Sequence, residues 1–100
     1  MDTVEKNEMM FVQLVSMFQV AALQQMGKIK NPATDKVERN MEQAQLSIDL
    51  IDMLKEKTKG NRSVDEERFL SSVLQDLKLN YVDELAKEAS TPATKSEAAQ

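Results

Sequence analysis

The feature that most constrains the fold of this chain is an uncharged stretch near its start. No charged side chain lies between Glu8 and Lys28, and most residues in that interval are apolar. The stretch has helical periodicity. Gln13, Ser16 and Gln24 lie on one side of the predicted helix, but Met17 and Val20 fall on the same side and interrupt it. The helix predicted over about residues 3–26 therefore has no wholly polar face. Such a helix needs burial around nearly all of its circumference.

Helical periodicity continues in two further segments. The second helix is predicted over about residues 35–59, because Asp35–Glu38 forms a variant capping box. The third is predicted over about residues 64–88 and begins at a regular capping box, Ser63–Glu66. Gly27 stands where a left-handed cap would end the first helix. The three predicted helices are therefore similar in length.

Similar helix lengths and short connections favour antiparallel neighbours. We therefore expect an all-α fold, either a three-helix up-down-up bundle or helical hairpins, assembled through the first helix. The three helices form one domain over residues 1–88. Residues 89–100 contain no large apolar side chain, so we expect a disordered tail there.

Composition excludes most catalytic chemistry. The chain contains no histidine and no cysteine, which removes the commonest general base and every Ser-His or Cys-His nucleophile pair. Asp49, Asp52 and Glu56 share one helical face and are oxygen ligands of the type that Mg²⁺ or Ca²⁺ accepts. We interpret them as a solvated face. The sequence predicts a non-enzymatic protein without a cofactor or metal site.

Charge limits the classes of partner. Lys and Arg number 13 and Asp and Glu number 17, which gives a net charge of −4. No face can be strongly basic, so we expect no nucleic-acid binding. The start of the chain lacks the basic region of a secretory signal, and cytoplasmic localisation is expected. Glutamines within the first helix argue against lipid exposure, so membrane contact is expected only through a partner complex.

The first helix is the predicted interface. The other two helices cover only part of the circumference of the first helix. Monomeric proteins rarely expose a large contiguous apolar surface such as the rest of this helix. We expect it to drive homo-oligomerisation or to dock on another protein. The residues predicted to make the contact are Phe11, Leu14, Val15, Phe18, Val20 and Leu23.

Two alternatives remain for the function. The chain is either a small accessory subunit of a larger, possibly membrane-bound, complex or a carrier of an apolar ligand. The second alternative rests on the methionines of the first helix, because methionine-rich surfaces bind adaptably. Those side chains are Met9, Met10, Met17 and Met26.

Several short motifs carry a family resemblance over about residues 9–83. They are Phe11-x-x-Leu14-Val15-x-Met17, Ala22-Leu23-x-x-Met26-Gly27, Pro32-x-Thr34, Ala44-x-x-x-Ile48-Asp49, Met53-Leu54-x-Glu56-Lys57-Thr58-Lys59-Gly60-Asn61 and Tyr81-Val82. The pattern resembles the bacterial family known as domain of unknown function 1844. The chain departs from it at Met26, where leucine is usual, at Asp35, where glycine is usual, and at Arg62, where an aliphatic residue is usual. The resemblance implies a small helical cytoplasmic protein and transfers no catalytic residue.

Overall fold

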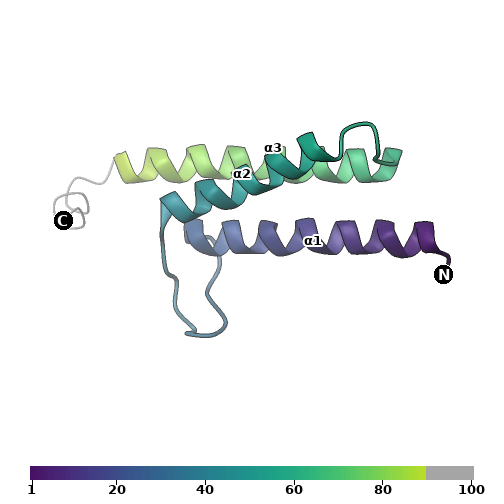
Figure 1. The fold of residues 1–100 in the computed structure, drawn as a ribbon. Coiled ribbons are helices and arrows are strands. Elements are labelled where there is room, and N and C mark those ends of the chain that lie inside the picture. The colour runs from purple at the N-terminus through teal and green to yellow at the C-terminus, as the bar shows by residue number, and fades with distance from the viewer. Residues whose placement is uncertain (90–100) are drawn as a thin grey trace.

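The structure, a computed structural model, describes residues 1–89. It contains three helices in that range, α1 (Thr3–Met26), α2 (Met41–Lys57) and α3 (Val64–Ala89), and no strand among the described residues. α2 runs back along α1, and α3 reverses direction again, so the order is up-down-up (Figure 1). The predicted all-α three-helix architecture is confirmed. α3 ends one residue beyond its predicted limit, and the rest of the predicted tail lies outside the described residues.

Local capping fixes both ends of α1. The backbone N–H of Glu5 donates to Asp2 Oδ1 (2.8 Å), and the N–H of Asp2 donates to Glu5 Oε1 (3.1 Å). This reciprocal pair satisfies two donors that a helix start leaves without partners. Gly27 ends the helix with φ of 86°, the left-handed conformation that the sequence predicts.

α2 begins at Met41, so the predicted start near Asp35 is wrong. Asp35 has φ of 57°, and its N–H donates to the carbonyl of Asn31 (2.7 Å) within a tight turn. The N–H of Asn31 also donates to the carbonyl of Lys36 (2.8 Å), which closes that turn. The actual N-cap is Asn40, whose side chain accepts from the N–H of Gln43 (3.1 Å). These turn hydrogen bonds compete with helix formation, and α2 is correspondingly short.

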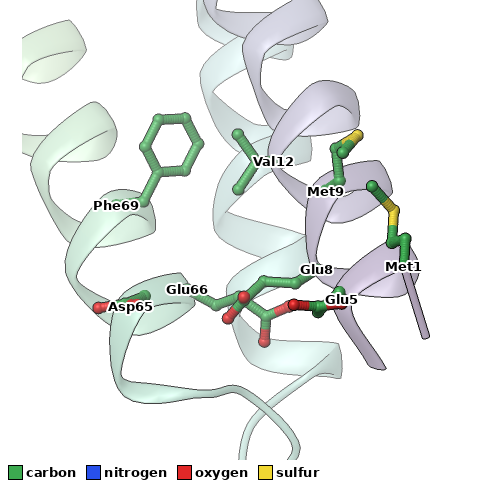
Figure 2. Close-up of a pocket in the computed structure, with 8 residues that line it drawn as sticks. All are labelled: Met1, Glu5, Glu8, Met9, Val12, Asp65, Glu66 and Phe69. Carbon is green, nitrogen blue, oxygen red and sulfur yellow. The ribbon is translucent and has the colours of Figure 1, made fainter. Parts of the chain in front are cut away.

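The predicted capping box of α3 is confirmed. The N–H of Glu66 donates to Ser63 Oγ (3.1 Å), and the N–H of Ser63 donates to Glu66 Oε1 (2.8 Å). Ser63 Oγ also donates to a carboxylate oxygen of Glu8 on α1. This contact ties the first turn of α3 to α1, and the two segments face each other across a shallow hollow (Figure 2).

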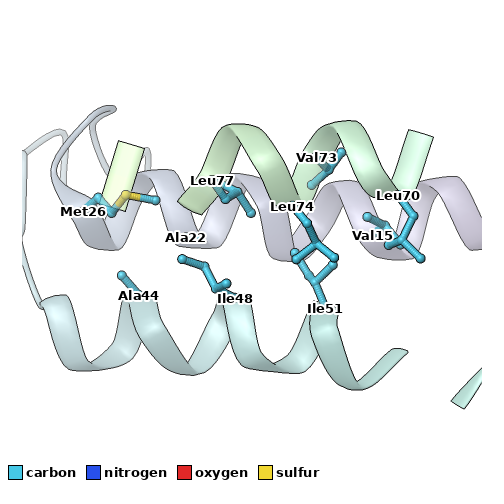
Figure 3. Packing of buried hydrophobic residues seen from close by; sticks show 10 residues of the cluster. All are labelled: Val15, Ala22, Met26, Ala44, Ile48, Ile51, Leu70, Val73, Leu74 and Leu77. Carbon is cyan, nitrogen blue, oxygen red and sulfur yellow. The ribbon is translucent and has the colours of Figure 1, made fainter. Parts of the chain in front are cut away.

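The hydrophobic core lies along the line where the three helices meet (Figure 3). Each helix contributes side chains at the three- and four-residue spacing of one helical face. The buried apolar residues are Val15, Ala22, Met26, Ala44, Ile48, Ile51, Leu70, Val73, Leu74 and Leu77. α1 supplies three of them, and Phe11, Phe18 and Leu23 of the same helix pack partly buried against this core.

Candidate functional site

The side of α1 that faces away from the core is exposed and alternates apolar with polar side chains. Met10, Met17 and Val20 are 51%, 64% and 45% exposed. These three residues alternate with Lys6, Gln13 and Gln24 along one stripe of the helix, at spacings of four and three residues. We call this stripe the outer seam. The outer seam consists of Lys6, Met10, Gln13, Met17, Val20 and Gln24. Its spacing is that of the contact positions of a coiled coil.

A second apolar strip lies beside α1 on α2. The side chain of Gln25, with its amide nitrogen turned toward α2, donates to Ser47 Oγ (2.7 Å) and to the carbonyl of Gln43 (3.0 Å). Gln43 therefore lies on the edge of α2 that borders α1. Leu46 and Leu50 follow Gln43 at three- and seven-residue intervals, so they share its face.

Exposure along that strip extends the apolar surface beyond α1. Leu46 is 51% exposed and Met53 is 43% exposed. On α1, Leu14 is 39% exposed on the flank of the outer seam. The two helices thus present apolar side chains on neighbouring outer edges.

The six residues predicted as the interface are divided by the structure. Leu14 and Val20 are exposed and available to a partner. Val15 is fully buried, so it belongs to the core of its own chain. The aromatic pair and the leucine that complete the prediction pack partly buried against that core; they are Phe11, Phe18 and Leu23. Met10 and Met17, which are prominent in the outer seam, were absent from the predicted contact set.

The hollow between α1 and α3 has an apolar floor and an acidic rim (Figure 2). Met9, Val12 and Phe69 line its floor. The rim carboxylates Glu8 and Glu66 are engaged by Ser63, one by its hydroxyl and the other by its backbone N–H. Their chemistry is that of helix capping and helix–helix contact.

The acidic face of α2 is paired with neighbouring polar groups. Asp52 Oδ2 lies 3.1 Å from Lys78 Nζ on α3, and Asp49 Oδ1 accepts from Gln45 Nε2 (2.8 Å). Among residues 1–89, no group of three or more His, Cys, Asp or Glu side chains is placed to hold a metal ion.

A buried carboxylate joins α3 to the connection between α1 and α2. Glu84 is 5% exposed, and Arg39 Nη1 (2.7 Å) and Lys28 Nζ (2.8 Å) contact its two oxygens. Lys87 Nζ lies 3.0 Å from Glu84 Oε2. The hydrogen bond from Lys28, followed by that from Lys87, lowers the pKa of Glu84 to about 2 against the opposing effect of burial. The pKa of Lys28 is raised by the same hydrogen bond.

The Glu84 cluster has a structural consequence for α1. Lys28 follows the C-cap of α1 and Arg39 precedes the N-cap of α2, so Glu84 holds both ends of one connection. Sequence reasoning did not identify this cluster, because a lone glutamate on a helix gives no signal of its burial.

The length and apolar composition of α1 also meet the requirements of a membrane span. Helix α1 nevertheless packs one side against α2 and α3, as its buried residues Val15, Ala22 and Met26 show.

The matched family model is "Domain of unknown function (DUF1844)", and it covers residues 8–83. The chain belongs to this family. The match confirms the resemblance carried by the sequence motifs, and it begins one residue earlier than expected and ends at the expected residue. No curated protein and no solved structure matches the chain. The DUF1844 region contains most of the outer seam, the Glu84 cluster's Lys28 and Arg39, and the core of all three helices.

Proposed function

We propose that this DUF1844 protein is a non-enzymatic interaction protein that binds another protein chain through the outer seam of α1. The observation that carries the proposal is the exposure of Met10, Met17 and Val20 on a helix face without charge from residue 9 to residue 27. Solvent-facing helix surfaces normally carry charged side chains. An apolar neutral stripe is typical of a helix-binding surface.

The exposed area is large enough to matter energetically. Complete burial of a Met, Leu or Val side chain contributes about 1.5–3 kcal/mol. Because Met10, Leu14, Met17 and Val20 are 39–64% exposed, burying the rest of each contributes about 1 kcal/mol, or about 4 kcal/mol for each copy of the surface. This gross gain is opposed by the entropy lost on association. Because that cost is about 4–15 kcal/mol, the outer seam alone supports only a weak contact, and a stable complex needs further contacts.

The shape of the surface favours a protein partner over a small apolar ligand. The hollow on the outer seam is lined by Gln13, Ser16, Met17 and Val20, and it is open along one side of a single helix. Ligand carriers instead surround most of the ligand with protein. A rod-shaped partner such as another helix fits an open stripe of this length.

The second candidate is an accessory subunit of a larger complex. In this case a different protein binds the outer seam. Because α1 has the length and composition of a membrane span, that protein can belong to a complex at a membrane. We expect the chain itself to work in the cytoplasm in either case.

The test of the proposed function compares two variants with the same change of charge. Met17→Glu places a carboxylate in the outer seam, whereas Leu79→Glu places one on α3 at a residue that is equally exposed (64% and 65%). We expect Met17→Glu to weaken self-association in solution or capture of a partner from cells of the source organism by at least about tenfold. Circular dichroism checks that both variants fold.

The control separates a specific surface from general stickiness. Leu79→Glu should leave association and capture unchanged. If Met17→Glu changes neither, the outer seam is not the binding surface and the proposed function is wrong.

A further inference from the structure

We draw no further inference here: the strongest candidate, the shallow hollow between α1 and the first turns of α3, carries nothing, because the capping of α3 and its contact with α1 already account for the rim carboxylates Glu8 and Glu66, and nothing in the structure of residues 1–89 shows what covers the apolar floor.

Discussion

Replacing Glu84 by glutamine tests how strongly one buried carboxylate holds the connection between α1 and α2 on α3. The substitution keeps the size of the side chain and removes its charge. Lys28, Arg39 and Lys87 then lose the anion that they share. Removing one partner of a buried ion pair is strongly destabilising, because the remaining charge loses its compensation.

The magnitude follows from the pKa of Glu84. Its pKa is about 2, against an ordinary value of 4.5, and the difference corresponds to about 3 kcal/mol of folding free energy at neutral pH. Lys28, Arg39 and Lys87 are 25%, 33% and 59% exposed, so water screens part of this interaction. We expect Glu84→Gln to lower the free energy of unfolding by about 2 kcal/mol, which for a domain of this size lowers Tm by about 8–16 °C.

Urea unfolding followed by circular dichroism measures this loss at fixed protein concentration. Because folding depresses the pKa of Glu84, its contribution is fully present above about pH 4.5 and is lost as the pH falls toward about 2. The stability difference between the unaltered chain and the variant should therefore shrink over that interval. Glu88→Gln is the control, since Glu88 also contacts Arg39 (3.4 Å) but is 42% exposed. Equal effects of both substitutions, or a difference independent of pH, would refute the reasoning.

Two further predictions concern the turn and the core. Asp35→Gly should raise the free energy of unfolding by about 0.5 kcal/mol, because φ of 57° favours glycine over a residue with a Cβ; urea unfolding measures it, and a loss of stability would contradict it. Ile51→Ala should cost about 2–4 kcal/mol, since Ile51 is fully buried where the helices meet. Thermal unfolding checks the second value, and a loss below about 1 kcal/mol would show that the site is loosely packed.

Helix boundaries that depend on a single local signal were predictable from the sequence. Gly27 ends α1, and Ser63 with Glu66 begins α3, because the conformational freedom of glycine and the reciprocal capping hydrogen bonds act within one turn. The start of α2 was not predictable in this way. Asp35 and Glu38 have the spacing of a cap, but the backbone hydrogen bonds of Asn31 place Asp35 in a turn instead.

The side of α1 that faces the core was hard to predict from the sequence. In an amphipathic helix the boundary between charged and apolar residues shows which side faces the core. Between residues 9 and 27 that boundary is missing, so the sequence could not distinguish Val15, which is buried, from Met17, which is exposed. The rotation of α1 about its axis is set by its contacts with α2 and α3. The Glu84 cluster was also missed, because tertiary contacts set its burial. Lys28 and Arg39 are distant from Glu84 in sequence and reach it only in the folded chain.

The exposed faces of the three helices differ in how many charged residues they carry, and α1 carries the fewest. α2 and α3 also expose apolar side chains, but charged residues accompany them. Glu42 and Lys57 accompany Leu46 on α2, and Asp76 and Asp83 lie three residues before and four residues after Leu79 on α3. A partner that covered those faces would have to remove charged groups from water, which is costly. Covering the outer seam removes mainly methionine, valine and neutral glutamine. The face of α1 is therefore the one whose burial carries the smallest desolvation cost, which supports the proposal that a partner covers it.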